Sequence, residues 1–147
     1  YKDFKKEILN DYRNIVISRE ASLLGRKEVL SGKAKFGIFG DGKELPQIAM
    51  AKVFDKGDFR SGYYRDQTFM FAINKLTVKQ FFSGLYANTN FEEEPMSGGR
   101  QMGSHFSSIF IDNKGEVSST CPKTKWPLIS SPTRNDFSIF IVSPFLI

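Results

Sequence analysis

The start of the chain alternates between apolar and polar positions with the period of an amphipathic helix. Apolar side chains recur three or four residues apart, while lysine, aspartate, asparagine and arginine fill the other face. The apolar stripe consists of Phe4, Ile8, Tyr12 and Ile15, widened by Leu9, Val16, Leu23 and Leu24. This pattern predicts a helix over residues 4–24 that is the longest regular element, with an interruption at Gly25 and an end near Ser31 and Gly32.

Shorter elements are predicted further along the chain. A second helix over residues 44–54 has Pro46 in its first turn, and another helix begins at the N-cap Thr77 and ends near Tyr86. The second helix is expected to bury one face, made of Ile48, Ala49, Val53 and Phe54. The remaining candidates are a strand or extended segment at 34–39, a short strand at 59–64, and a hairpin at 109–117 that turns at 112–115.

The end of the chain has a different composition. Residues 118–132 are rich in Ser, Thr and Pro, and Pro122, Pro127 and Pro132 are expected to prevent regular structure. Residues 137–147 are apolar, uncharged and β-prone, which is an aggregation hazard for an unpartnered end. We therefore expect residues 1–133 to form one folded region and residues 134–147 to be a divergent tail, produced by a truncation or a break in the reading frame. The absence of an initial Met leads us to expect that the sequence begins inside a longer chain.

Composition narrows the class of protein. With 147 residues, 40% hydrophobic residues and 15 Phe, the chain can bury the core of a single domain. One Cys and one His exclude a disulfide framework and a Cys/His zinc site, so a reducing compartment, the cytoplasm, is expected. No apolar run reaches the roughly 20 residues of a membrane helix. The net charge of +5 fits an anionic ligand but is too small to identify one.

Three motifs carry candidate chemistry, and each also has a structural interpretation. The segment Gly40-Asp41-Gly42 can aim a carboxylate at Mg²⁺ beside a diphosphate, or form a turn that caps the next helix, which we favour. The segment Gly62-Tyr63-Tyr64-Arg65-Asp66 offers a hydroxyl and an arginine fork to an anion, or a surface cluster of Arg65 and Asp66. The Gly-rich segment from Gly98 to His105 either closes over a cofactor or is an ordinary connection. Its lone His has no identifiable partners for a catalytic triad.

Taken in order, these motifs resemble the α part of the thiamine-diphosphate-dependent 2-oxo acid dehydrogenase E1 component. The matching segments are Arg19-Glu20, Gly40-Asp41-Gly42-Lys43-Glu44, Gly62-Tyr63-Tyr64-Arg65-Asp66 and Gly98-Gly99-Arg100-Gln101-Met102-Gly103-Ser104-His105. The resemblance covers residues 8–105 and, weakly, 130–133. It is nearest to the branched-chain (2-oxoisovalerate) type, particularly bacterial forms with fused α and β parts. It implies an α/β thiamine-diphosphate-binding fold, of which this chain holds the N-terminal portion, mostly helical with a few short strands.

The resemblance implies roles for individual residues. Tyr64 and Arg65 match the pair that contacts the cofactor diphosphate, and residues 41–44 match a stretch that opens an early helix rather than the family's magnesium turn. Residues 100–102 and His105 match the loop that borders the active-site entrance, and no other catalytic residue is assigned.

The last matching serines and one apolar residue complete the comparison with the family. Ser130 and Ser131 match serines near the cofactor and a structural potassium ion, which makes Ser131 a candidate cofactor contact and Ser130 a remnant of the potassium site. Ile38 stands where pyruvate-type members carry a His, which favours a branched-chain substrate. The pattern stops after Pro132, and the family's magnesium motif is absent, so any Mg²⁺ is expected to be held by residues outside this chain.

The activity and partners are also implied by the resemblance. The intact enzyme decarboxylates a 2-oxo acid on thiamine diphosphate and passes the acyl group to the lipoyl domain of E2. An E1 β part, separate or fused, completes the homo- or hetero-oligomer. The 147 residues alone are expected to be inactive, and neither nucleic acid nor membrane is an expected partner.

Two other functions stay open on the residues alone. One is a small basic module for nucleic acid or another polyanion, although Lys and Arg are scattered and interleaved with Asp and Glu. The other is a non-catalytic interaction piece whose apolar tail docks a partner. General polyanion binding would fall steeply with salt, which separates the first alternative from a cofactor enzyme.

Overall fold

The computed structural model describes residues 2–55, 58–62, 65–100, 108–111, 117–122 and 139–141. The helices are α1 (Lys2–Leu30), α2 (Glu44–Val53), α3 (Gln67–Ala72) and α4 (Val78–Leu85). The strands are β1 (Phe59–Gly62), β2 (Ser108–Ile111), β3 (Val117–Pro122) and β4 (Ile139–Ile141). The described part of the chain is therefore mostly helical, as predicted, and α1 is its longest element.

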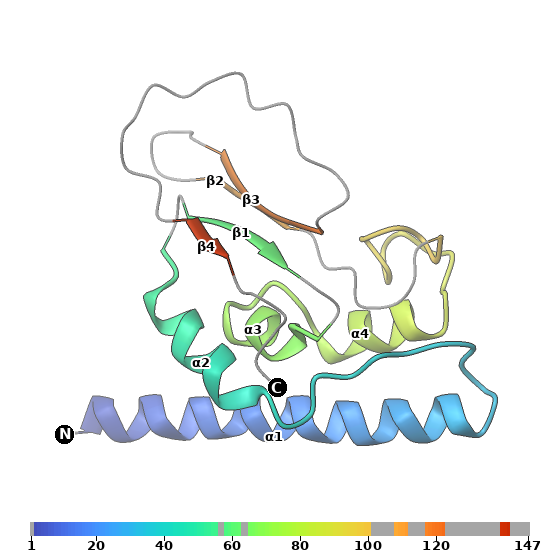
Figure 1. Ribbon diagram of the computed structural model, residues 1–147, viewed down its shortest axis with the longest axis horizontal. Coiled ribbons are helices and arrows are strands. Elements are labelled where there is room, and N and C mark those ends of the chain that lie inside the picture. The colour runs from blue at the N-terminus through green and yellow to red at the C-terminus, as the bar shows by residue number, and fades with distance from the viewer. Residues whose placement is uncertain are drawn as a thin grey trace.

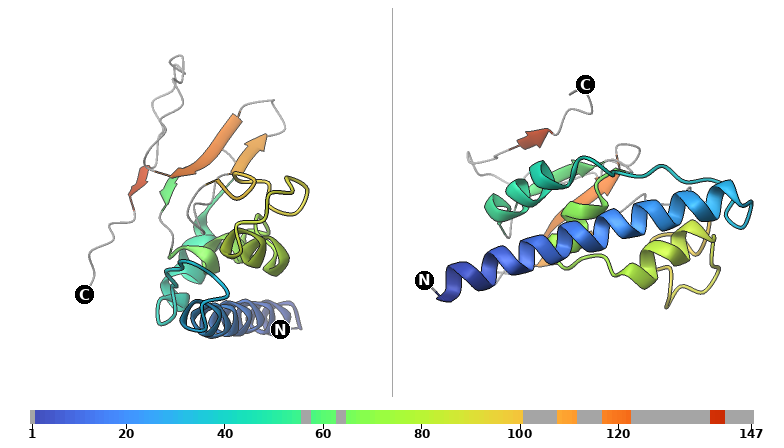
Figure 2. Two further views of the ribbon diagram at one scale, coloured as in Figure 1. Left: turned by 90° about the vertical axis from the view of Figure 1, so that its right-hand side faces the viewer. Right: turned by 90° about the horizontal axis from the view of Figure 1, so that it is seen from below.

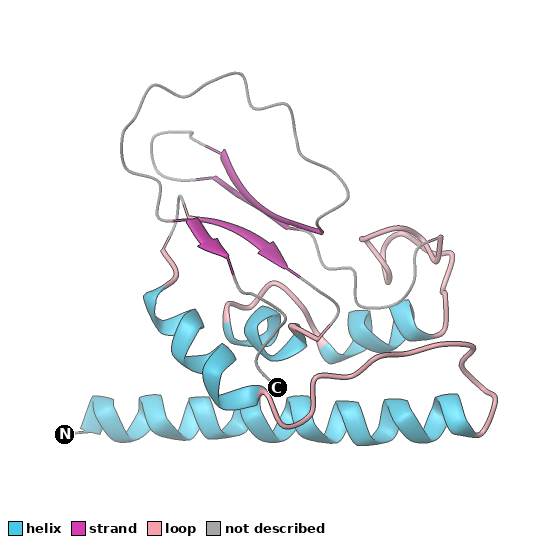
Figure 3. Ribbon diagram, in the orientation of Figure 1, coloured by secondary structure: helices cyan, strands magenta, loops and turns pink. Residues whose placement is uncertain are grey.

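The elements form three layers (Figure 1). Helix α1 runs along one side, α2, α3 and α4 form the middle layer, and the strands lie beyond them. A view turned by 90° shows the same order (Figure 2). The loop after α1 runs back along that helix to reach α2 (Figure 3), so the start of α2 lies beside the middle of α1.

The strands form one sheet in the order β2-β3-β1-β4. Strand β1 is parallel to both of its neighbours, with Arg60 opposite Thr120 on one side and Phe140 on the other. Strands β2 and β3 pair antiparallel, with Ile111 opposite Val117, as in the predicted hairpin. The predicted turn at 112–115 lies outside the described residues.

Two expectations for the end of the chain need correction. Pro122 was expected to prevent regular structure, but it is the last residue of β3. A proline at that position removes only one donor N–H from the ladder, so it ends the strand without preventing it. In the predicted tail, Ile139–Ile141 forms β4 at the edge of the sheet. The rest of 134–147 lies outside the described residues, and the domain boundary at 133 stays a prediction.

Helix α1 buries small residues rather than its large apolar ones. The side chains of Ser18, Ala21 and Ser22 are buried, and Gly25 is buried among them. A Cβ at Gly25 would lie 2.4 Å from Cε1 of Phe39, so this glycine lets the phenyl ring pack directly on the helix. The predicted interruption at Gly25 is therefore wrong. The predicted end near Gly32 is confirmed, because Gly32 has φ +78° just after the last helical residue.

Phenylalanines build much of the core between α1 and the middle layer. Phe69, Phe71 and Phe81 are buried together with Ala21, Met70 and Leu76. The Phe54 and Phe69 rings meet edge to face with centroids 5.1 Å apart, and Phe81 meets Phe82 in the same way at 5.3 Å. The high Phe content of the sequence is thus explained in part by packing.

The start of α4 matches its prediction and the buried face of α2 does not. The N-cap Thr77 accepts a hydrogen bond from the Gln80 N–H, and the Gln80 side chain accepts one from Thr77 N–H, which is a complete capping box. In α2, Ile48 is buried as predicted, but Ala49 and Val53 are exposed. Polar side chains, described next, take the inner positions that these two were expected to hold.

Candidate functional site

Arg65 lies in the turn between β1 and α3. Because β3 and β4 are both parallel to β1, the carboxyl ends of these three strands meet at one edge of the sheet. Ligands of open α/β sheets bind outside that edge, where the chain leaves a strand whose neighbours lie on opposite sides. The Arg65 side chain is exposed and forms no ion pair with the residues that the structure describes. An anion can therefore reach its guanidinium.

The backbone of this turn is held by the loop before α2 and by α2 itself. The side-chain amide of Gln47 donates a 2.9 Å hydrogen bond to the Arg65 carbonyl oxygen, and its own oxygen accepts one of 3.0 Å from Phe69 N–H. A Cβ at Gly40 would lie 2.2 Å from the same Arg65 oxygen, so only glycine allows this approach. Gln47 and Gly40 thus fix the position from which the Arg65 side chain starts.

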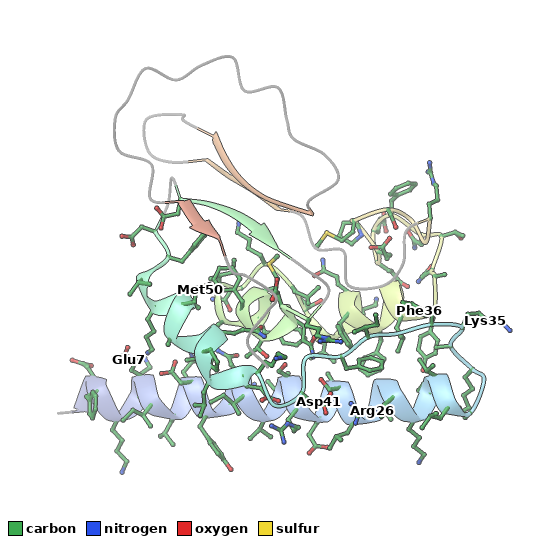
Figure 4. All side chains as sticks on the ribbon, viewed as in Figure 1. Glu7, Arg26, Lys35, Phe36, Asp41 and Met50 are labelled. Carbon is green, nitrogen blue, oxygen red and sulfur yellow. The ribbon has the colours of Figure 1, made fainter. Side chains whose placement is uncertain are left out.

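Two ion pairs fasten the loop before α2 to α1, and we call them the α1 clamp. Arg19 binds Glu44 through two hydrogen bonds of 2.6 and 2.9 Å, and Arg26 donates one of 2.6 Å to Asp41. Figure 4 shows Arg26 and Asp41 close together between α1 and this loop. Hydrogen bonding from Arg19 lowers the pKa of the Glu44 carboxyl, even though burial opposes the change. The same bond raises the pKa of Arg19.

The α1 clamp decides between the two interpretations of Gly40-Asp41-Gly42. The Asp41 carboxylate is engaged by Arg26, and α2 begins two residues after Gly42. Gly42 has φ +87°, which is the left-handed conformation that glycine adopts readily in a turn. The segment is therefore a helix-capping turn in this structure. Among the described residues there is no group of three or more His, Cys, Asp or Glu side chains suited to a metal ion.

A buried polar network joins α3 to α1 beneath the turn. Ser18 and Thr68 hydroxyls are 2.6 Å apart, and Gln67 donates a 2.6 Å hydrogen bond to the Ser22 hydroxyl. Ser22 in turn donates to the Ser18 carbonyl. All four side chains are fully buried. Since buried hydroxyl and amide groups fit only a few partners, this network fixes how α3 is placed against α1.

The predicted pairing of Arg65 with Asp66 as a surface cluster is wrong. Asp66 is buried at the N-cap position of α3, whereas Arg65 is exposed. The two side chains therefore have different surroundings, and only Arg65 faces solvent. The other predicted site residues, Tyr64, His105, Ser130 and Ser131, lie outside the described residues.

The Gly-rich segment begins on a second rigid support that the sequence did not reveal. The buried Glu94 carboxylate accepts hydrogen bonds from the N–H groups of Met96, Ser97 and Gly99, and from the Ser97 hydroxyl. Burial alone would raise the pKa of Glu94, but these donors, with Gly99 first, lower it. Gly98 and Gly99 have φ of +58° and +74°, which glycine adopts at little cost.

A separate hollow of about 280 Å³ lies between α1 and the chain around α3 and α4. Its lining is Asn10, Arg13, Asn14, Ile17, Phe71, Asn74, Leu76, Thr77 and Val78. It contains none of the predicted site residues, so it is distinct from the Arg65 turn.

Sequence reasoning missed Gln47 and Glu94, the two side chains that hold these loops. Gln47 follows Glu44 by three positions in α2, and that spacing places both on the inner face. A polar residue at a buried helical spacing was the available signal. Glu94 is followed closely by Ser97, Gly98 and Gly99, a pattern in which backbone N–H groups can curl around a carboxylate.

These features define an α/β protein with a candidate anion contact at the carboxyl end of a parallel strand. Residues 12–131 match the family model described as "Dehydrogenase E1 component". That match spans most of the 147 residues, so the chain belongs to the dehydrogenase E1 component family. The resemblance stated from the motifs is thereby confirmed. The family depends on thiamine diphosphate.

A curated relative gives a more detailed comparison. The chain is 33% identical over 106 residues to the 2-oxoisovalerate dehydrogenase subunit alpha of Bacillus subtilis (strain 168). The aligned region is 69% of this chain and 30% of that relative, so the chain spans about a third of the relative's length. None of the described helices is both long and apolar enough to cross a membrane.

Proposed function

We propose that the chain is the N-terminal part of the α region of a 2-oxo acid dehydrogenase E1 enzyme and supplies one side of its diphosphate contact. The observation that carries this proposal is the exposed Arg65 on a backbone that Gly40 and Gln47 hold in place. The family match over residues 12–131 supplies the reaction class, oxidative decarboxylation of a 2-oxo acid. Arg65 would contact the diphosphate together with Tyr64.

The described residues fit thiamine diphosphate in part. An unpaired arginine on a fixed turn suits a diphosphate oxygen, because a guanidinium donates two parallel N–H bonds to phosphate. Mg²⁺ would have to be held by other residues, since the described part offers no cluster of acidic or His ligands. When bound, the cofactor supplies the carbanion stabilisation that decarboxylation needs. This chain contributes binding and orientation.

A single arginine cannot hold the cofactor by itself. A hydrogen bond to a charged group contributes about 1.5–3 kcal/mol, whereas micromolar affinity requires about 8 kcal/mol. The 147-residue chain alone should therefore bind thiamine diphosphate no better than millimolar, with or without Mg²⁺. The remaining affinity would come from the other α residues and from an E1 β part, and the lipoyl domain of E2 would accept the acyl group.

Calorimetry on an E1 protein that carries this chain with the remaining α and β parts tests the role of the turn. Arg65→Ala should weaken thiamine diphosphate binding about 10- to 100-fold through the loss of one charged contact. Gly40→Ala should also weaken it, because the new Cβ would displace the Arg65 carbonyl. The matched control Gly42→Ala, which has no atom within 4 Å of the new Cβ, should change affinity little. Equal losses from Arg65→Ala and from Arg60→Ala, outside the matched pair, would contradict the assignment.

The substrate is the second part of the proposal. Ile38, half-buried beside the Gly40 turn, occupies the position where pyruvate-type members carry a His. An apolar side chain there favours a branched-chain 2-oxo acid, in keeping with the printed name of the relative. The comparison of kcat/KM for 2-oxoisovalerate and pyruvate in the same complete protein, with and without Ile38→His, tests this. A preference for pyruvate in the unmodified protein would exclude the branched-chain assignment.

A further inference from the structure

The outer face of α1 carries an apolar side chain at every seventh position. Leu9, Val16, Leu23 and Leu30 follow one another at this spacing, and they are 57%, 38%, 46% and 81% exposed. Seven residues make nearly two helical turns, so the four side chains lie in one line along the helix. We call these four residues the outer seam. The exposed Tyr12 lies beside it.

The rest of the described molecule lies on the other side of α1. The inner positions Ser18, Ala21, Ser22 and Gly25 are buried against α3 and the loop before α2. In Figure 1 every other element lies above α1, and from below α1 crosses in front of them (Figure 2). No element of the described chain therefore covers the outer seam.

The spacing of the outer seam selects a helix as its occupant. Apolar side chains repeated every seven residues form the contact line of two helices packed side by side, each inserting side chains between those of the other. From Leu9 to Leu30 the line is about 32 Å long at 1.5 Å per residue. An extended strand presents side chains with a period of two and cannot follow this line.

The charges beside the outer seam are mostly positive. Lys5, Arg13 and Lys27 form no ion pair with the described part of the chain, and Glu20 is the one acidic residue among them. The arginines of the α1 clamp border the seam as well, but Glu44 and Asp41 already balance their charge. A partner that complements this face must carry acidic residues on both sides of its own apolar line.

A second copy of the chain does not meet this requirement. An antiparallel pairing that aligns the two outer seams end to end places Arg13 beside the Lys27 of the other copy, and Glu20 beside its own counterpart. A parallel pairing in register places each flanking charge near the same charge. Like charges brought together in this way oppose association.

We propose that the outer seam docks an amphipathic helix of another polypeptide, with apolar residues at heptad spacing and Asp or Glu on both flanks. This inference rests on the geometry and charge of α1 and does not depend on the dehydrogenase function. It therefore stands or falls separately from the Arg65 assignment.

Binding of designed peptides to the 147-residue chain tests the proposal. The probe is a fluorescent helical peptide of four heptads with one Leu per heptad and Glu on both flanks, and the comparison peptide has Lys in place of Glu. Fluorescence anisotropy should show that the Glu peptide binds at least about tenfold more tightly than the Lys peptide. The double variant Val16→Ser and Leu23→Ser should weaken the Glu peptide about tenfold or more.

Control variants separate docking from unfolding. Leu45→Ser and Val53→Ser change equally exposed apolar residues of α2 and should leave peptide binding unchanged. Arg13→Gln with Lys27→Gln keeps the outer seam intact and should remove most of the preference for Glu over Lys. Circular dichroism should report the same helix content for all variants, because each of these side chains is exposed or half-buried.

Three results would overturn the proposal. The first is that neither peptide binds. The second is a dimer in sedimentation equilibrium that the Val16→Ser and Leu23→Ser variant abolishes, which would make a second copy the occupant. The third is that a single-stranded oligonucleotide displaces the Glu peptide and binds independently of Val16 and Leu23, which would indicate a polyanion surface instead.

Discussion

Glu44 and Glu94 are equally buried carboxylates that are compensated in opposite ways. Each is 4% exposed, and in each the pKa is lowered despite burial. Glu44 receives the guanidinium of Arg19, which is 25 positions away in the sequence. Glu94 receives N–H groups from residues that follow it by no more than five positions.

The difference teaches which part of the structure each carboxylate holds together. The pair of Glu44 with Arg19 joins α1 to α2, and α2 carries the Gln47 that holds the Arg65 turn. Its loss should therefore spread from the helix interface to the candidate site. Glu94 closes only its own loop, so its loss should stay local and affect the entry to the Gly-rich segment.

The largest expected effect is that of Arg19→Ala. This change leaves the Glu44 carboxylate buried without its cation, and breaking one partner out of a buried pair costs about 3–5 kcal/mol. We expect a loss of about 3 kcal/mol in the free energy of unfolding, at the low end because Arg19 is itself partly exposed. Urea denaturation followed by circular dichroism measures it.

The matched change Glu44→Ala should cost less. It leaves Arg19 free to turn toward water, so no charge is stranded in the interior. The order of the two losses is therefore the informative result. If Glu44→Ala destabilises the protein more than Arg19→Ala, burial of the carboxylate is not what makes this pair important.

A smaller and more local effect is expected for Glu94→Ala. The change leaves the N–H groups of Ser97 and Gly99 without their acceptor, at about 1–3 kcal/mol for a buried unsatisfied donor. We expect about 2 kcal/mol, with faster amide hydrogen exchange confined to residues 94–100. The control Glu92→Ala, at an exposed neighbouring position, should change neither quantity. Faster exchange throughout α1 would show that Glu94 supports more than its own loop.

The helices were predictable because their signals are local. The cap at Thr77, the turn before Glu44 and the end of α1 near Gly32 each depend on a few neighbouring residues. The buried face of α1 was not predictable in the same way. Its small side chains are chosen by the close approach of Phe39 and of the polar network to Gln67 and Thr68, which depends on residues far along the chain.

The candidate site was predictable in its motifs but not in its supports. The order of motifs identified the family, and Arg65 was named from it. The sequence could not show that Gly40 and Gln47 both hold the Arg65 carbonyl oxygen, because 25 and 18 positions separate them from it and the fold alone brings them together. Glu94 was missed because a carboxylate with only backbone partners leaves no charged partner to notice.

The smallest expected effect is a dependence of stability on pH that both carboxylates share. Their pKa values are lowered in the folded protein, while an unfolded glutamate titrates near about 4.3. The unfolded chain therefore binds more protons in this range, so stability rises with pH. The contribution of the two groups is complete above the unfolded pKa and is lost as pH falls through the folded one. Urea midpoints at neutral pH and at about pH 3.5 should thus differ less in Glu44→Gln with Glu94→Gln than in the unmodified chain. Glu28 and Glu93, whose pKa values are lowered by hydrogen bonds from Tyr86 and Lys79, should keep a shallow dependence in the variant. Identical pH profiles for the two proteins would show that neither buried carboxylate is stabilised in its charged form.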